Sequence, residues 1–419
     1  MEIIYKTPSD KHYFFGYYDK SPLNKDNSKI LACRPTFIER MPSSNDLLEI
    51  GYFDWKNSDE FIKLTETKTW NWQQGCMLQW LPPIHDEKII YNDLVNNKFV
   101  TVIFNTKTKI KTILPMAYYT ISNNGEYAFC IDFERHYWFR SGYNYQGIEN
   151  KSKKKKIDHQ DGIWRLELKT NKLKQILKMS DILEKKPLSN MLAASHYIEH
   201  LMVSPNSKRL SFLHRWQIEG GGIFSRLYTI NIDGSDINLV SDSGRMSHFC
   251  WRNERELLAY GGQKNLLNSL RKFKYFSKYF FKFLLPLYNL FLSNNSKIRL
   301  KLTGDNYLLF EDKSNSVKKV DSNLLTEDGH PSFNPNNQDI FVSDTYEQKD
   351  NHRELFLFDL NKKIKILIDR LYSTPKFNNS PIRCDLHPKW SRDGKYISID
   401  TINNGTRGIY VYSVNKFIK

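Results

Sequence analysis

The sequence has little cysteine and no recognisable leader. Among 419 residues there are only five cysteines, an odd number, with no Cys-x-x-Cys spacing. This argues against a disulfide framework, and the apolar strand-like surroundings of most of them indicate buried free thiols. The segment Met1–Pro8 shows no basic region followed by an apolar core, so no secretory signal is expected. These absences predict a cytoplasmic, reduced protein.

Familiar cofactor and catalytic motifs are also absent. The chain contains no Gly-rich phosphate loop, no Ser-His-Asp elbow and no His-Glu-x-x-His motif. No nucleotide cofactor is therefore expected. Long helical periodicity is nearly absent outside one segment, whereas short apolar runs of strand length separated by polar turns are frequent.

What the chain does contain is a repeated phrase. In His200–Trp216 a Ser-Pro-Asn turn joins two short apolar runs, and a histidine stands four residues before the serine. The phrase returns after His330 and His387, more loosely after His248, and in weaker form upstream. Seven turn positions anchor these units: Ser21, Leu81, Ser122, Ser204, Arg252, Asn334 and Ser391. Self-similarity of this kind is typical of a repeat architecture.

Seven strand-rich units predict an all-β fold, a seven-bladed β-propeller made of four-stranded blades. We expect residues 1–419 to form a single propeller domain with a helical insertion, residues 264–301, in the fifth blade. The segment Ile3–Tyr5 is expected to pair with the last blade, which would close the ring and remove a sheet edge.

The positive charge is concentrated in two insertions. The net charge is +16, but residues 151–156 and 264–301 hold fourteen of the 62 basic residues and no acid. The rest of the chain has 48 basic and 46 acidic residues and is nearly neutral. A nucleic-acid-binding protein should carry a basic stripe across its fold, so no nucleic-acid partner is expected.

The insertion in the fifth unit has helical periodicity. Leucine and phenylalanine recur at a period close to 3.6 along Leu266–Leu292, and lysines line another face. Its apolar run Tyr279–Leu292 is too short to cross a bilayer. A basic amphipathic helix of this kind predicts contact with an anionic membrane surface, so the protein would be peripheral at the inner membrane. The alternatives are a lid or side cover on the propeller and a dimer contact.

Chemistry-bearing residues occupy one equivalent position of the repeat. The residue four places before each anchor is, in chain order, Tyr17, Met77, Tyr118, His200, His248, His330 and His387. Equivalent positions in a propeller face the mouth of the central channel, and histidine has no strong preference for burial that packing would explain. Convergent imidazoles suit a divalent metal such as Mn²⁺, Zn²⁺ or Fe²⁺. Alternatively, one histidine is a general base and the others bind a carboxylate.

Arginines near this rim are candidates for holding an acidic sugar. Arg215 follows His214, Arg140 lies in an irregular loop with Tyr143, and Arg383 precedes the last rim histidine. A guanidinium fork matches the geometry of a carboxylate.

At these residues the sequence resembles a known family. The phrases that start at Gly329, Asp344, Leu386 and Thr406 are similar to those of the propeller polysaccharide lyases, which include the oligogalacturonate lyases and their ulvan-lyase relatives. The resemblance covers the last half of the chain, and the first half only at Phe15–Pro22 and near Arg140. The blade phrase itself is shared with many non-enzymatic propellers, so it supports the fold more than the activity.

The resemblance implies β-elimination on a uronate-containing glycan, with a His or Tyr base and a metal or arginine that neutralises the carboxylate. It assigns the metal to His248, His330 and His387, with Mn²⁺ or Zn²⁺ as the ion. The catalytic and clamping residues it suggests are His200, His214, Arg215, Arg140 and Tyr143. Tyr17, Tyr118 and Arg383 would bind an acidic oligosaccharide or polysaccharide. Met77 departs from the pattern because it offers no ligand.

Three functions therefore compete. The first is a carbohydrate-active lyase linked to bacterial capsule or exopolysaccharide metabolism, an expectation that rests on the resemblance. The second is a non-catalytic glycan-binding or scaffold propeller in the same biosynthesis, which would need neither rim histidines nor an arginine clamp. The third is a glycosyl-transfer enzyme, which ranks last because no nucleotide-sugar motif is present.

Overall fold

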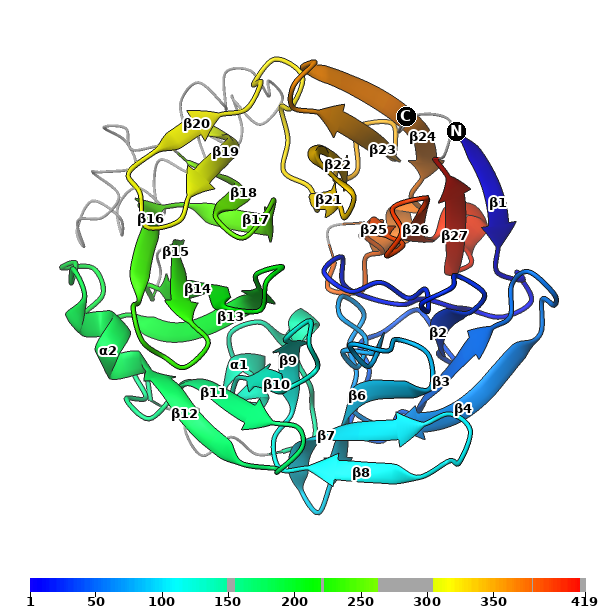
Figure 1. Ribbon diagram of the computed structural model, residues 1–419, viewed down its shortest axis with the longest axis horizontal. Helices are drawn as coiled ribbons and strands as arrows, with labels where there is room; N and C mark the ends of the chain where they lie inside the picture. Colours follow the sequence, from blue (N-terminus) through cyan, green and yellow to red (C-terminus); the bar gives the residue numbers. More distant parts are fainter. Residues whose placement is uncertain (149–154, 220–221, 263–303, 379, 415–419) are drawn as a thin grey trace.

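Seven antiparallel sheets surround a central axis in the computed structural model of this protein (Figure 1). The structure describes residues 1–148, 155–219, 222–262, 304–378 and 380–414. Each sheet runs outward from the axis, as in the blades of a propeller. The predicted all-β, seven-bladed β-propeller is confirmed.

The first four blades, each given from its innermost strand outward, occupy the N-terminal half of the chain. The first blade contains β2 (Ile30–Arg34), β3 (Leu48–Phe53) and β4 (Phe61–Thr67). The second contains β5 (Gln79–Trp80), β6 (Lys88–Val95), β7 (Lys98–Asn105) and β8 (Lys111–Leu114). The third contains β9 (Tyr118–Ile121), β10 (Tyr127–Cys130), β11 (Gly162–Glu167) and β12 (Leu173–Lys178). The fourth contains β13 (Ser195–Val203), β14 (Arg209–Gln217), β15 (Ile223–Asn231) and β16 (Asn238–Gly244).

The remaining blades follow the same order. The fifth contains β17 (Met246–Trp251), β18 (Glu256–Gly262), β19 (Asp305–Glu311) and β20 (Val317–Lys319). The sixth contains β21 (Ser332–Asn334), β22 (Asn337–Asp344), β23 (His352–Asp359) and β24 (Ile364–Tyr372). The seventh contains β25 (Lys389–Trp390), β26 (Tyr396–Thr401), β27 (Gly408–Ser413) and β1 (Glu2–Lys6). Short helical turns lie between strands: α1 (Phe133–Tyr137), η1 (Ser141–Tyr143), α2 (Met179–Glu184), η3 (Pro375–Phe377) and η4 (Asn403–Gly405).

The ring is closed by the N-terminal strand, as predicted. β1 pairs with β27 in antiparallel register, with Ile3 opposite Tyr412 and Tyr5 opposite Val411. Both ends of the chain thus contribute to one sheet, and the edge of β27 is covered. Tyr5 is buried and its ring lies 5.6 Å from that of Trp55, so the closing strand is also anchored in the core.

Neighbouring blades are tied together by tryptophans at the end of the innermost strands. The indole of Trp80 donates to the carbonyl of Pro22, 2.8 Å away, and that of Trp390 donates to Ser332, also at 2.8 Å. Trp251 makes the equivalent bond to Met202 at 3.2 Å. Each tryptophan stands one residue before a repeat anchor, so the repeated phrase encodes the contact between blades as well as the turn.

Other sequence predictions concern the cysteines, the insertion in the fifth blade and membrane contact. All five cysteines are buried and free. The insertion at 264–301, including the amphipathic segment Leu266–Leu292, lies outside the described residues, and its membrane contact stays a prediction. Within the described part of the chain, no helix combines the length and apolar character that crossing a membrane requires.

We predict that removing residues 1–6 destabilises the ring. The truncation exposes the edge of β27 and the apolar surface that Tyr5 covers, and burial of one such side chain contributes about 1.5–3 kcal/mol. The free energy of unfolding in urea should fall by at least that amount. Glu2→Ala, which alters only an exposed side chain of the same strand, is the control and should behave as wild type. Equal stability of truncated and full-length protein would show that β1 does not close the ring.

Candidate functional site

Five aromatic side chains from five blades form a closed circle around the axis. In order around the ring they are Tyr17, His200, His248, His330 and His387. Neighbouring ring centroids lie between 4.2 Å, for His248 and His330, and 5.7 Å, for His200 and His248. All five are buried. The structure thus brings together all four histidines of the equivalent repeat position, together with Tyr17. We call this set the histidine ring.

Irregular backbone at these positions turns the side chains inward. β13 shifts register between Glu199 and Met202, and His200 within this bulge has a left-handed backbone with φ 54°. His387 and Met77 have similar positive φ values of 43° and 57°. A β-bulge re-aims a side chain, and left-handed backbone at a non-glycine residue is tolerated mainly where function or packing requires it.

An N-terminal segment packs against the histidine ring. The carboxylate of Asp400 accepts hydrogen bonds from the backbone of Phe15 at 2.7 Å and of Gly16 at 3.0 Å. Gly16 has φ 124°, and a Cβ there would come within 2.8 Å of the Gln74 backbone, so glycine is required. The segment places Tyr18 against three of the histidines, and the Tyr18 hydroxyl donates to the carbonyl of Phe249 at 2.8 Å.

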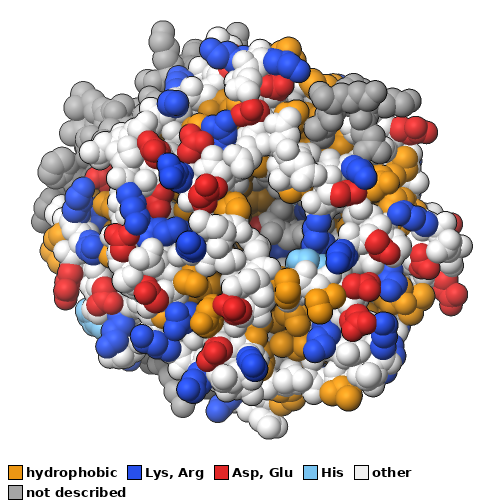
Figure 2. Space-filling view, in the orientation of Figure 1, with side chains coloured by type: hydrophobic (Ala, Val, Ile, Leu, Met, Phe, Trp, Pro, Cys, Tyr) orange, Lys and Arg blue, Asp and Glu red, His pale blue; other side chains and the backbone are white. Residues whose placement is uncertain are grey.

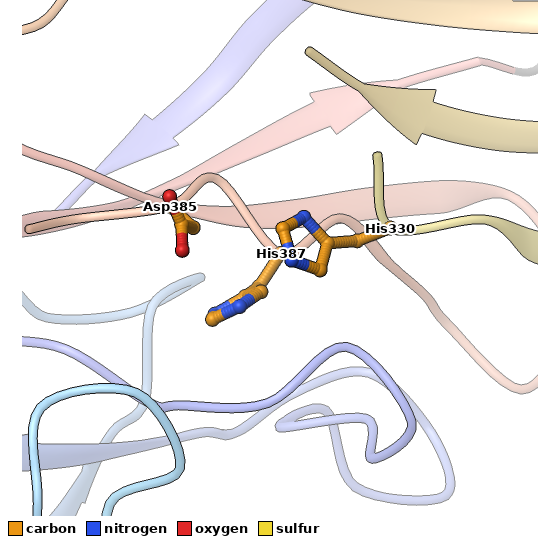
Figure 3. Close-up of side chains that lie close together, drawn as sticks. All are labelled: His330, Asp385 and His387. Carbon is orange, nitrogen blue, oxygen red and sulfur yellow. The ribbon is translucent and has the colours of Figure 1, made fainter. Parts of the chain in front are cut away.

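Two histidines and a carboxylate form a candidate metal site in the described part of the chain. One ligand atom from each of His330, Asp385 and His387 lies within 4.8 Å of the others, and all three residues are buried (Figure 3). His330 approaches from just before β21, and the other two from the loop before β25. Asp385 was not predicted from the sequence, although its position two residues before His387 could have indicated a second ligand.

The hydrogen bonds of His330 suit it to metal binding. Its Nδ1 lies 2.9 and 3.0 Å from the two carboxylate oxygens of Asp344, which accept a hydrogen bond from Nδ1 and orient the ring, so Nε2 is the nitrogen left for a metal ion. Nε2 of His330 and of His387 are buried and have no hydrogen-bond partner among the described residues. Two imidazole nitrogens beside a carboxylate oxygen fit Mn²⁺ or Zn²⁺.

The carboxylate of Asp385 is shared with two arginines. Arg353 donates to one oxygen and Arg383 to the other, each at 2.8 Å. Burial opposes ionisation of Asp385, but Arg383 and Arg353 outweigh it and lower its pKa to about 2. Asp385 therefore stays ionised, which suits a metal ligand.

His248, the third predicted metal ligand, has a different partner. Its Nδ1 lies 3.2 Å from the carboxylate of Asp328, which also accepts a 2.6 Å hydrogen bond from Ser247. It lies beside the metal group but does not belong to it. Asp385 takes the place that the sequence analysis gave to His248.

A second cluster surrounds Glu199, which was not predicted. Arg140 lies 2.7 Å from the buried Glu199 carboxylate, Arg215 forms an ion pair with the same oxygen, and His136 lies 3.3 Å from the other. Burial opposes ionisation, but Arg140 and Arg215 outweigh it and hold the pKa of Glu199 well below its usual range. Both predicted clamp arginines thus reach the site next to His200, each already paired with a carboxylate.

Tyr143 and Arg383 complete one wall of the site. Arg383 donates to the Tyr143 hydroxyl at 2.6 Å, and the Arg140 guanidinium lies 4.0 Å from the centre of the Tyr143 ring. The loop that carries Arg140 and Tyr143 is fastened by the buried Arg135, which donates to the carbonyl of His196 at 3.0 Å.

Two predicted residues lie elsewhere. His214 pairs with His196, with Nε2 and Nδ1 2.9 Å apart, and stacks on Trp216. Because side chains alternate along β14, His214 faces away from the side on which Arg215 reaches Glu199. The Tyr118 hydroxyl donates to the carbonyl of Met77, in the neighbouring blade, and no described contact joins it to the histidine ring.

One face of the propeller is hollowed at its centre. Figure 2 shows this hollow, with basic and histidine side chains at its edge. The pKa values of His200 and His387 lie well below 6.5 because burial disfavours the imidazolium form, so both rings are neutral at neutral pH. Burial also raises the pKa of Tyr17 well above 10, so its hydroxyl keeps its proton. His200, His387 and Tyr17 are therefore uncharged at neutral pH, and the positive charge of the site is carried by its arginines.

Comparison with known proteins supports the fold. No protein-family profile and no curated protein sequence matches this chain. Among solved structures, an oligogalacturonate lyase in complex with manganese has a TM-score of 0.61 and 13% identity, over 97% of this chain and 92% of the other. An oligogalacturonate lyase from Vibrio parahaemolyticus has a TM-score of 0.62 and 11% identity, over 99% and 93%.

Propellers with other functions are also similar. A hydrazine synthase from Kuenenia stuttgartiensis has a TM-score of 0.53 and 10% identity, over 97% of each chain. At such identities the likeness establishes the class of protein, a seven-bladed β-propeller, and the fold alone does not determine the activity.

We predict that the hydrogen bond between the Asp344 carboxylate and His330 strengthens metal binding. Asp344→Asn removes the charge that orients His330, and loss of such a partner typically weakens metal binding about 10- to 100-fold. Titration of chelator-treated protein with Mn²⁺, followed by calorimetry, measures the effect. Asp350→Asn, at the surface Asp350–His352 pair, is the matched control and should bind as wild type. Unchanged affinity in Asp344→Asn, or no binding by wild type, would contradict this site.

We also predict that acid destabilises the metal-free protein through its buried histidines. The pKa of His196 is lowered to about 4, and that of His387 lies well below 6.5. Below pH 6.5 these histidines therefore bind protons in the unfolded chain but not in the native state. Stability should therefore fall as the pH drops from 6.5 towards 4, by up to about 1.4 kcal/mol per pH unit for each such histidine. Asp161 acts in the opposite direction, because burial raises its pKa to about 7.

Urea unfolding of His387→Gln across this pH range isolates one histidine. Its stability should change less steeply with pH than that of wild type, since glutamine does not titrate. His352→Gln, which alters a half-buried surface histidine, should keep the wild-type slope. Equal slopes for all three proteins would show that His387 is protonated in the native state.

Proposed function

We propose that this propeller is a polysaccharide lyase that cleaves a uronate-containing glycan by β-elimination. The observation that carries the proposal is the histidine ring, in which two unpartnered imidazole nitrogens beside Asp385 adjoin a His–Tyr pair. Support comes from the likeness in fold to oligogalacturonate lyases, one of them a manganese complex. The expected substrate is an acidic surface polysaccharide or a fragment of one.

The metal site supplies the electrostatic part of the reaction. His330, His387 and Asp385 would hold the ion. A divalent cation bound there would stabilise the negative charge that builds on the uronate carboxylate when the neighbouring proton is removed. Arg383 keeps Asp385 ionised and joins it to Tyr143, so one wall of the sugar pocket is fixed with respect to the metal ligands.

The Tyr17–His200 pair supplies the proton transfer. The Tyr17 hydroxyl lies 2.8 Å from Nδ1 and 2.9 Å from Nε2 of His200, and the two rings are stacked with their planes 5° apart. Neutral His200 accepts the proton from C5 of the uronate, the C4–O bond breaks, and a C4–C5 double bond forms. Tyr17 donates its proton to the leaving oxygen and is reprotonated by His200, so the net transfer is from C5 to the leaving oxygen.

The Glu199 cluster favours a second candidate, a propeller that binds glycans without cleaving them. Arg140 and Arg215 both pair with the single Glu199 carboxylate, so each guanidinium already has a carboxylate partner with which a substrate carboxylate must compete. Such a protein would recruit a polysaccharide to other enzymes, and its histidine ring would serve only in binding. Binding without product formation would support this candidate.

The test of the lyase proposal is formation of an unsaturated product. Purified protein with Mn²⁺ should convert a uronate oligosaccharide into one whose C4–C5 double bond, conjugated with the carboxylate, absorbs in the ultraviolet. His200→Asn should lower kcat by about 100- to 10,000-fold, since loss of a general base has effects of that order. Asparagine tolerates the left-handed backbone at this position, so the fold is preserved.

His352→Asn controls for histidine replacement away from the site and should retain full activity. Absence of product from homo-oligomers of galacturonate, glucuronate and mannuronate, and also from oligomers that alternate a uronate with a neutral sugar, would refute the lyase proposal. A fully active His200→Asn protein would instead refute the assignment of the base.

A further inference from the structure

A groove lies between the fourth and fifth blades, and its lining includes Ser247, the neighbour of His248 in the histidine ring. Its volume is about 230 Å³. The side chains that define its chemistry are Arg215, Arg245, Ser247, Tyr260, Asp305 and Asp328. Two of these are one contact away from the ring: Asp328 is hydrogen-bonded to His248, and Arg215 is paired with Glu199, the neighbour of His200. A sugar bound at the ring therefore has its chain neighbour in or near this groove.

The arginines of the groove are already engaged by carboxylates. Arg245 donates from Nε to one oxygen of Asp305 at 2.8 Å and from Nη2 to the other. The two residues therefore form a bidentate ion pair. Arg215 is paired with Glu199, which is buried. A bidentate pair of this kind satisfies the geometry by which an arginine would otherwise recognise a carboxylate.

The groove has no net positive charge with which to attract an anion. The two arginines that line it are matched in number by Asp305 and Asp328, and the Glu199 carboxylate behind Arg215 is matched by Arg140, so these six charges sum to zero. A second uronate in the groove would bring its carboxylate close to Asp305 and Asp328. It would have to displace Asp305 from Arg245 or remain unpaired, and unpaired charge in a partly buried site is costly.

We infer that the groove is a subsite for a neutral sugar, so that the preferred glycan alternates uronate with an uncharged residue rather than being a homopolymer of uronate. This inference rests on the proposed function. Carboxylate oxygens have lone pairs beyond those used in one ion pair, and a guanidinium has five donors. Sugar hydroxyls can therefore bind to these pairs without breaking them.

The test compares two tetrasaccharides of equal length, a homo-oligomer of galacturonate and an unsulfated alternating oligomer of glucuronate and N-acetylhexosamine. Calorimetry with Mn²⁺ in the His200→Asn background measures affinity without turnover. We expect the alternating oligomer to bind about tenfold more tightly, equivalent to roughly 1.4 kcal/mol. Asp305→Asn removes the negative charge that pairs with Arg245, so it should reduce the preference to about threefold or reverse it.

Asp339→Asn is the matched control, because Asp339 forms the same kind of ion pair with Arg252 on the fifth blade, outside the groove, and it should keep the tenfold preference. Equal or tighter binding of the homo-oligomer, no binding of either oligomer, or a preference unaffected by Asp305→Asn would overturn the neutral subsite. Failure of the wild-type protein to cleave either oligomer would count against the lyase proposal alone, since the affinity ratio still decides the inference.

Discussion

The candidate site depends on one geometrical constraint: seven innermost strands surround a single axis, so equivalent residues of different blades converge on it. A residue that is unremarkable in one strand becomes part of a cluster when the same position is repeated. His248, His330 and His387 meet in this way, with centroids 4.2 and 4.4 Å apart between neighbours. Closure of the ring by β1 and the tryptophan bonds between blades keep the axis fixed, and with it the distances between the histidines.

The buried carboxylates of the site are stabilised by positively charged or hydrogen-bonding partners. Isolated charges inside a protein are strongly unfavourable, whereas paired and hydrogen-bonded charges are accepted. Here Glu199 is paired with two arginines, Asp385 with two more, and Asp344 with the imidazole of His330. Burial lowers the pKa of His200 and of His387, so these two rings stay neutral and their nitrogens are able to bind a cation or accept a proton.

The repeat made much of this arrangement predictable from the sequence, since the spacing of histidine and anchor is local and survives in each blade. The paired carboxylates were not predictable in the same way. Glu199 meets Arg140 only through a loop of another blade, and a shift at the β13 bulge decides which of two neighbouring residues faces the axis. For the same reason Tyr118 turned towards the neighbouring blade, and strand alternation separated His214 from Arg215. Contacts that depend on bulges and on loops between blades leave little trace in the spacing of residues.

The most direct test of this account is the location of the metal. Crystals of the protein soaked in Mn²⁺ and measured at the manganese absorption edge should give an anomalous peak within bonding distance of the Nε2 atoms of His330 and His387 and of an Asp385 oxygen. The peak should vanish in crystals of His330→Ala grown and soaked in the same way. A peak at another place, or none in a wild-type crystal in which the histidine ring is ordered, would contradict the claim that the repeated histidines form a metal-binding site.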